Sequence, residues 1–251
     1  MDLDLLMRIE EAALNAWPAP RQLLYDGWLL RFAGGHSKRV NSVNPLCASK
    51  LPLVEKIHTC ESIYSRQGQP CLFRISELFE TPDLINALQA AGYRPFDPTL
   101  VLGRKLDLTE RGPADVTILE MPPADWFRLR SEFIRVTTAD QKSHEAILES
   151  IVPEKVLVGL FINGHPLVCG MAVIEGSLLG FFSIYTASTW RRKGYGSLIM
   201  GALSDWGVER GAQYGYLQVE GDNEPALALY DALGFERCYQ YVYYQKKELG
   251  D

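Results

Sequence analysis

The spacing of hydrophobic residues changes between residues 155 and 210, and this change constrains the fold more than any other feature of the chain. Up to residue 186, short turns such as Asn163-Gly164 separate three β-branched or alternating runs. These predict successive antiparallel strands at 155–162, 166–174 and 178–186. From Tyr195 to Arg210 the hydrophobic residues recur every three to four positions, which predicts an amphipathic helix. A strand meander that leads directly into a helix predicts an α/β (α+β) fold.

The same spacing rules predict the other elements of the second half. They are strands at 116–121, 214–220 and 238–245, and helices at 124–136, 139–151 and 223–233. Asp222 or Asn223 is the expected N-cap of the last helix, and Gly234 ends it. From residue 115 onward, the predicted order is therefore β-α-α-β-β-β-α-β-α-β.

The first half has a similar predicted order in its later part. We expect strands at 23–25, 28–32, 39–43, 71–75 and 100–104, and helices at 51–66 and 83–91. Residues 90–93 (Ala-Ala-Gly-Tyr) also resemble residues 232–235 (Ala-Leu-Gly-Phe). Two interpretations stay open. One is a weak internal duplication, and the other is chance, because a helix–Gly–aromatic–strand connection is common.

The best candidate boundary between the halves is the segment 106–115, where polar, charged, Gly and Pro residues replace the hydrophobic pattern. This predicts two units, residues 1–107 and residues 115–251. The prediction agrees with a length of 251 residues, which allows one large domain or two small ones.

The segment that carries the most chemical information is 186–197, between a predicted strand and the predicted helix that begins at Tyr195. Backbone amides at a helix N-terminus have no partner within the helix and favour negative charge. Gly194 and Gly196 allow the main chain to approach a ligand closely, and Arg191, Arg192 and Lys193 add positive charge. This pattern predicts a loop that binds a phosphate or pyrophosphate. It matches neither a P-loop nor a dinucleotide-binding fingerprint.

Two segments resemble the GNAT superfamily of N-acetyltransferases. Arg191-x-x-Gly194-x-Gly196 is similar to its R/Q-x-x-G-x-G/A signature, and residues 217–235 resemble its strand–Asn–helix–Leu-Tyr–Leu-Gly-Phe segment. The resemblance covers roughly residues 115–247. It implies the GNAT fold, a mixed and mostly antiparallel sheet flanked by helices, here in a tandem arrangement. The first unit is then a degenerate GNAT-like domain, and the second is the catalytic domain.

The resemblance also implies roles for individual residues. The pyrophosphate of acetyl-CoA would be held by Arg191, Arg192, Lys193, Gly194, Tyr195, Gly196 and Ser197. The strand residues Ile184, Tyr185 and Thr186 would contact the pantetheine and the acetyl carbonyl. Asn223 and Ala226 would also contact the cofactor, although Asn223 could equally be a plain N-cap.

Tyr230 is the implied general acid, which would protonate the departing thiolate. It lies seven residues after Asn223, two helical turns, and therefore on the same helix face. The alternative is that Tyr230 only packs between helix and sheet. A general base is less clear, because residues 181–186 contain no carboxylate. Glu220 and Glu175 are the nearest candidates, of which we select Glu220, and a chain of water molecules is equally possible.

The first unit has no glycine near residues 47–53, where a duplication would place its own signature. We therefore expect it not to bind a pyrophosphate but to help wall the acceptor site. Residues 34–39 (Gly-Gly-His-Ser-Lys-Arg) are expected to form a turn. The tyrosines of the last strand are expected to serve in packing.

Charge and composition exclude several classes of function. With 25 Lys and Arg against 31 Asp and Glu, the net charge is −6 and there is no long basic run, so we expect no nucleic-acid partner. No apolar run is long enough to span a membrane, and the N-terminus does not resemble a signal peptide, which favours a cytoplasmic protein. The histidines and cysteines lack metal-ligand spacing, so no metal is expected.

Together, these observations predict an enzyme that transfers an acetyl group from acetyl-CoA directly to a primary amine of a small molecule. The alternatives are a non-catalytic acyl-CoA-binding sensor and an acetyltransferase for protein lysines or N-terminal amines. The acidic net charge favours a cationic acceptor, and the sequence leaves the oligomeric state open.

Overall fold

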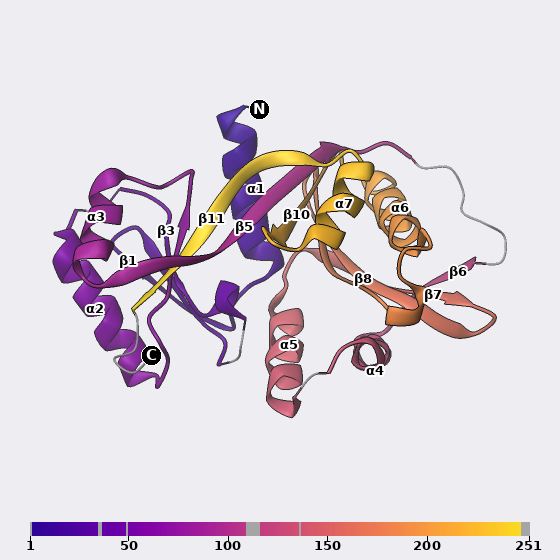
Figure 1. Ribbon diagram of the computed structural model, residues 1–251, viewed down its shortest axis with the longest axis horizontal. Helices are drawn as coiled ribbons and strands as arrows, with labels where there is room; N and C mark the ends of the chain where they lie inside the picture. The colour runs from indigo at the N-terminus through magenta and orange to yellow at the C-terminus, as the bar shows by residue number, and fades with distance from the viewer. Residues whose placement is uncertain (1, 35–36, 49, 109–115, 136, 247–251) are drawn as a thin grey trace.

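The computed structural model describes residues 2–34, 37–48, 50–108, 116–135 and 137–246. Within them, eleven strands form one mixed sheet in the order β1-β2-β3-β4-β11-β5-β10-β9-β8-β7-β6. The sheet extends through the whole molecule, from β1 (Arg21–Tyr25) to β6 (Val116–Glu120), as Figure 1 shows. The predicted α/β fold is confirmed.

After their first helices, both halves contain the same succession of strands and α-helices, while the 3-10 turn comes before the third of these strands in the first half and after it in the second. The first half has β1, β2 (Trp28–Phe32), η1 (Lys38–Val40), β3 (Val43–Pro45), α2 (Leu53–Arg66), β4 (Phe73–Ser76), α3 (Pro82–Ala90) and β5 (Tyr93–Lys105). The second half has β7 (Glu154–Ile162), β8 (His165–Glu175), β9 (Leu178–Thr186), η2 (Ser188–Trp190), α6 (Tyr195–Val208), β10 (Tyr214–Glu220), α7 (Glu224–Ala232) and β11 (Glu236–Lys246). In each, the third and fourth strands are parallel and a helix connects them. The shared topology favours the duplication over chance.

The two halves exchange their last strands. β5 pairs with β10 of the second half, and β11 pairs with β4 of the first half. β5 and β11 also pair with each other, and they run side by side across the centre of Figure 1. The predicted units 1–107 and 115–251 therefore share one sheet, although their separation as folding units stays a prediction. Most of the predicted boundary, residues 109–115, lies outside the described residues.

One helix absent from the predicted elements, α1 (Leu3–Ala16), crosses between the halves. Its side chain Ile9 is buried in the same cluster as Met171 of β8. Its buried Glu10 accepts hydrogen bonds from Arg74 of β4 and, at 2.7 Å, from the Tyr239 hydroxyl of β11. α1 thus joins strands of both halves on one face of the sheet.

The helices of the second half lie on both faces of the sheet. Along β8, Met171 and Val173 belong to the cluster formed with α1, α4 (Pro123–Phe133) and α5 (Thr138–Ser150). Their neighbours Ala172 and Ile174 belong to the cluster formed with α6 and α7. This alternation is that of a strand buried on both faces.

One predicted strand is wrong, because residues 39–43 do not form one. Lys38–Val40 is a 3-10 turn, and the strand is Val43–Pro45. The turn is fixed by the Asn41 side chain, which accepts from the amide of Ala33 at 2.8 Å and donates to the carbonyl of Ser37 at 2.9 Å. Asn residues compete in this way with ladder hydrogen bonds.

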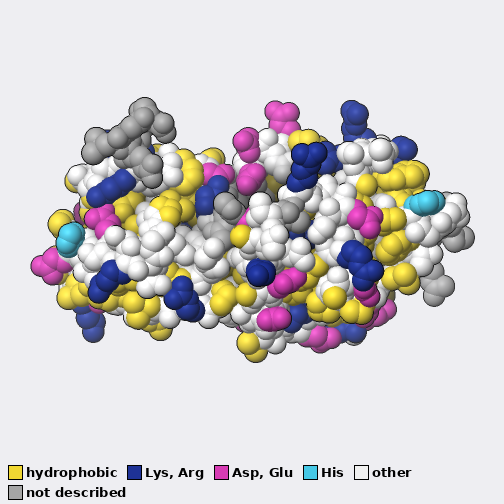
Figure 2. Space-filling model, turned by 90° about the horizontal axis from the view of Figure 1, so that it is seen from below, with side chains coloured by type: hydrophobic (Ala, Val, Ile, Leu, Met, Phe, Trp, Pro, Cys, Tyr) yellow, Lys and Arg dark blue, Asp and Glu magenta, His cyan; other side chains and the backbone are white. Residues whose placement is uncertain are grey.

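The face of the molecule seen from below in Figure 2 mixes both signs of charge. On the face shown in Figure 2, Lys and Arg side chains are interspersed with Asp and Glu and are not gathered in one patch. Among the described residues, no helix is long and apolar enough to span a bilayer.

Candidate active site

The sheet opens between β9 and β10. These parallel strands pair only from Tyr214–Leu217 to Leu178–Phe181. Beyond that point β9 bulges, because two residues, Ser183 and Ile184, lie opposite Gly170 of β8, and Ser183 has a φ of 52°. The rest of β10 pairs with β5 alone. The sheet is therefore open beside Ile184, one of the strand residues for which a contact with the pantetheine is predicted.

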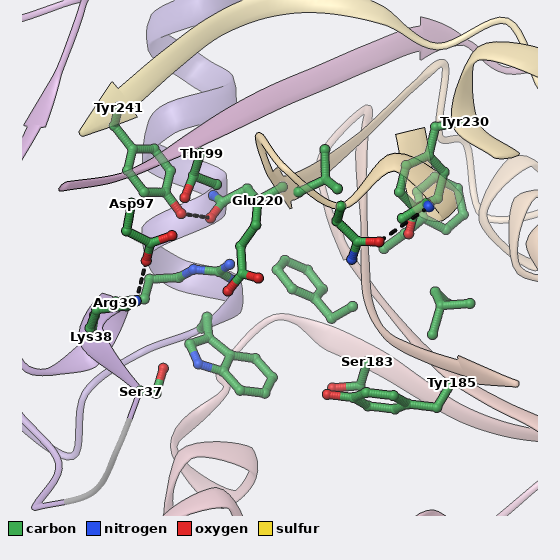
Figure 3. A pocket seen from close by; sticks show the side chains of 18 of the residues that line it. Ser37, Lys38, Arg39, Asp97, Thr99, Ser183, Tyr185, Glu220, Tyr230 and Tyr241 are labelled. Carbon is green, nitrogen blue, oxygen red and sulfur yellow. Dashed lines mark hydrogen bonds and ion pairs between the residues drawn. The ribbon is translucent and has the colours of Figure 1, made fainter. Parts of the chain in front are cut away.

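A cavity of about 550 Å³ occupies this opening. One wall is formed by the second half, and the other by the first half together with β11, as Figure 3 shows. The second half contributes Ser183, Ile184, Tyr185, Glu220, Asn223, Ala226 and Tyr230. The other wall includes Ser37, Lys38, Arg39, Asp97, Thr99 and Tyr241. The first half therefore forms one wall of the cavity, and its role in walling the acceptor site stays a prediction.

Six predicted site residues line this cavity: Ile184, Tyr185, Glu220, Asn223, Ala226 and Tyr230. Asn223 also caps α7, since its side-chain oxygen accepts from the amide of Ala226 at 3.3 Å. The N-cap interpretation is therefore confirmed. A cofactor contact by Asn223 stays a prediction.

Tyr230 projects from α7 into the cavity (Figure 3). Burial, with a smaller contribution from Tyr185, raises the pKa of Tyr230 to about 12. The hydroxyl is therefore protonated at neutral pH and can donate a proton. Its ring also packs edge-on against Phe235 at 5.9 Å, so a packing role coexists with the predicted catalytic one.

The loop from Arg191 to Ser197 lies beyond the end of β9, outside the lining of the cavity. Arg191 donates to the carbonyl of Thr186 at 3.2 Å, which ties the loop to the strand. Gly194, with a φ of 83°, occupies the N-cap position of α6, and a Cβ there would meet no atom within 4 Å. The side chains of Arg191, Arg192 and Lys193 are exposed. The loop thus offers cations and helix N-terminal amides on an open surface.

Gly196 has a packing role that the sequence did not indicate. A Cβ at this position would lie 3.1 Å from a methyl carbon of Leu229. Gly196 therefore lets the first turn of α6 approach α7 closely.

The two candidate bases lie in different places. Glu220, at the end of β10, lines the cavity. Glu175, at the turn between β8 and β9, accepts hydrogen bonds from the Asn15 side chain at 3.1 and 3.2 Å. This turn is at the other end of β9 from the cavity, so the structure favours Glu220.

Two further residues that line the cavity, His144 of α5 and Trp17, were not predicted from the sequence patterns. Burial and the nearby Arg130 lower the pKa of His144 to about 4, so its imidazole is neutral at pH 7. Helical spacing predicted α5 but not which of its polar residues would face a ligand. Among the described residues, no group of three or more His, Cys, Asp or Glu side chains could hold a metal ion.

The corresponding loop of the first half, between β3 and α2, is occupied by the chain itself. The Asp26 carboxylate accepts from the amides of Lys50 and Leu51, each at 3.0 Å. It also lies 3.2 Å from the buried ammonium of Lys56, which stacks on the Trp28 ring at 3.9 Å. An internal carboxylate thus accepts from amides just before α2 that would otherwise be available to an external anion. That this half binds no pyrophosphate stays a prediction.

Comparisons with known proteins agree with this geometry. Residues 6–244 match the family described as "Probable histone acetyltransferase Rv0428c C-terminal". The chain is 26% identical to an uncharacterized N-acetyltransferase, YobR, of Bacillus subtilis (strain 168), over 98% of this chain and 100% of that protein.

Solved structures share the fold. A GCN5-related N-acetyltransferase from Kribbella flavida superposes with a TM-score of 0.69 and 16% identity, over 97% of this chain and 96% of the other. A tandem GNAT protein from the clavulanic acid biosynthesis pathway superposes with a TM-score of 0.63 and 12% identity, over 81% and 74% of the two chains.

Proposed function

The chain belongs to the Rv0428c C-terminal family of the GNAT superfamily of N-acetyltransferases, and on this basis we propose that it transfers an acetyl group from acetyl-CoA to a primary amine of a small molecule. The observation that carries the proposal is the opening between β9 and β10. It holds a cavity with Tyr230 and Glu220 on its walls, and β9 leads from it to the loop before α6.

The loop before α6 suits the pyrophosphate of acetyl-CoA. Arg191, Arg192 and Lys193 supply positive charge, and the amides from Gly194 to Ser197 lie at the start of a helix. The space beside Gly194 is open, so the backbone is accessible to a ligand. Asn223 and Ala226 would contact the pantetheine within the cavity. The bound substrate supplies a thioester as the acetyl donor.

Glu220 accepts a proton from the ammonium group of the acceptor, directly or through water, because only the free amine is a nucleophile. The amine then attacks the thioester carbonyl. Beyond Phe181, the edge of β9 that faces β10 pairs with no strand of the described residues, and its N–H groups can stabilise the developing oxyanion. Tyr230 protonates the departing thiolate.

Transfer is direct, without an acyl-enzyme. Cys169 lies beside the opening but is fully buried, and burial raises the pKa of its thiol to about 12. A thiol that stays protonated is a poor nucleophile.

A small acceptor fits better than a protein, because the first half encloses the cavity from the side opposite Tyr230. The test is CoA release from acetyl-CoA over a panel of amino acids, polyamines, aminoglycosides and lysine peptides. We expect release with small amines. Turnover restricted to peptides would indicate a protein acetyltransferase. Stabilisation by acetyl-CoA without turnover of any amine would indicate a sensor, and stabilisation reaches about 2.7 kcal/mol at a hundredfold excess over Kd.

A further inference from the structure

The cavity wall contributed by the first half contains a cation for which the described residues provide no ionic partner. Lys38 is paired with Asp97. Arg39 forms no ion pair within the described part of the chain, and its Nε is buried without a hydrogen-bond partner. A buried polar group of this kind is costly unless a ligand satisfies it.

The surroundings of Arg39 add to the positive charge. Arg31 is fully buried, and its guanidinium donates to the carbonyls of Leu14, Trp17 and Arg39 at 3.0, 2.6 and 3.3 Å. It therefore gains hydrogen bonds but no neutralising carboxylate from these contacts. Arg74 takes the carboxylate of Glu10. Behind this wall, the buried carboxylate of Glu10 therefore serves Arg74 directly and Arg31 only at longer range.

The positive charge affects the pKa of the neighbouring Tyr241 hydroxyl. Burial alone would raise the pKa of Tyr241, but the Arg39 and Arg74 cations, together with hydrogen bonds from Thr99 and Arg39, outweigh it and lower that pKa. The Tyr241 hydroxyl donates to the side-chain oxygen of Gln218 at 2.9 Å, and Thr99 lies on the same wall (Figure 3). The wall is therefore polar and electropositive.

We propose that Arg39 binds a carboxylate of the acceptor, so that the acceptor is a small amine of the amino-acid type. This inference rests on the proposed function. Arg39 and Tyr230 lie on opposite sides of the cavity, with Glu220 between them (Figure 3). A carboxylate at Arg39 therefore directs the amine toward Glu220 and the opening of β9. Planar guanidinium groups bind carboxylates with two parallel hydrogen bonds.

A single negative charge matches this wall better than two. Lys38 is already neutralised by Asp97, and Glu220 would repel a dianion such as a phosphate monoester. The local charge therefore differs from the acidic net charge of −6, from which a cationic acceptor was expected. The cavity contacts the acceptor, whereas the net charge describes the whole surface.

The experiment measures CoA release with α- and ω-amino acids, each beside its own primary amide. With the wild-type protein, kcat/KM for the best acid exceeds that for its amide by tenfold or more, the size expected for a charged hydrogen bond. In Arg39→Gln the preference falls to threefold or less, while the amide is still turned over. Arg39→Lys keeps the positive charge but cannot form two parallel hydrogen bonds with a carboxylate. It therefore retains part of the preference for acids.

The matched control is Arg66→Gln, which removes one positive charge from an exposed position on α2. It keeps the full preference for acids. An amide that reacts as well as its acid in the wild type, or a preference that persists in Arg39→Gln, overturns the inference. Thermal melts in the absence of ligand identify any variant that fails to fold. If Arg39→Gln does not fold, the preference of Arg39→Lys for acids over amides is the deciding measurement.

A binding measurement distinguishes a failure of this inference from a failure of the proposed function. Thermal stabilisation by each acid and its amide is measured on the wild type and on Arg39→Gln without turnover. If no amine releases CoA, the proposed function fails, and a stabilisation by acids that Arg39→Gln loses still supports the carboxylate site. Equal stabilisation by acids and amides overturns it.

Discussion

The Asp26 carboxylate accepts a hydrogen bond of 3.0 Å from the amide of Lys50, at the position in the first half that corresponds to the Gly194 loop in the second. The same fold thus appears twice, with the loop before the helix filled from within in one half and open in the other. On the proposed function, this relationship would leave a duplicated chain with one cofactor site, in the second half.

Replacing Asp26 with Asn should destabilise the protein and leave the affinity for acetyl-CoA unchanged. Asn tolerates the φ of 44° found here, so the turn survives, but the buried Lys56 ammonium loses the negative charge of its ion-pair partner and keeps only the hydrogen bond of 2.6 Å to the Asp26 carbonyl from this residue. Removing one member of a buried ion pair costs about 3 kcal/mol. Chemical denaturation measures the loss. A stability equal to that of the wild type would show that the Asp26–Lys56 pair contributes nothing.

Tyr230→Phe should lower kcat by about a hundredfold and change KM little, because a general acid acts in the transition state. The hydroxyl with its pKa of about 12 keeps its proton through pH 10, so no alkaline loss of kcat from this group is expected below that pH. Tyr25→Phe, at the far edge strand β1, is the matched control. An unchanged kcat would show that Tyr230 packs against Phe235 and is not the general acid.

Glu220→Gln should lower kcat/KM at pH 7 by at least tenfold, and the rate should recover as the pH approaches the pKa of the acceptor amine. The free amine then no longer needs a base. Glu175→Gln is the control, since Glu175 contacts Asn15 and does not line the cavity. A pH–rate profile of both variants decides. If only Glu175→Gln loses activity, the assignment of the base is reversed.

His144 should make the protein less stable as the pH falls from about 6.5 to 4. Its pKa is about 4 in the folded protein and near 6.5 in the unfolded chain, so the unfolded chain takes up a proton first. Its full contribution is present above pH 6.5 and is lost toward pH 4. Thermal unfolding at pH 7 and pH 5 should show a smaller difference in His144→Phe than in the wild type. Equal differences would show that His144 is not the responsible group.

Local patterns predicted the second half well. The strand 178–186, the loop before Tyr195 and the helix containing Tyr230 are each specified by neighbouring residues, and all three are present. The other wall of the cavity could not be predicted in this way. Arg39 reaches it through a 3-10 turn, and Thr99 and Tyr241 reach it through the exchange of β5 and β11. Pairing between strands more than a hundred residues apart leaves no local signal.

The sequence contains the features of a helix at α1, although α1 is not among the predicted elements. Asp2 accepts from the amide of Asp4 as an N-cap, and apolar residues follow at helical spacing. Its place across both halves, however, depends on the Glu10–Arg74 pair, and nothing in the sequence links these two residues.

The most direct test of the proposed function is the affinity for acetyl-CoA of Gly194→Asp, which imitates in the second half the internal carboxylate of the first. Gly211→Asp is the matched control, because Gly211 has a φ of 91° and, like Gly194, open space around its Cα, but it lies at the other end of α6. Calorimetric titration should show a loss of at least a hundredfold in affinity for Gly194→Asp, and wild-type affinity for Gly211→Asp. Wild-type affinity in a folded Gly194→Asp protein would contradict the assignment of this loop as the cofactor site.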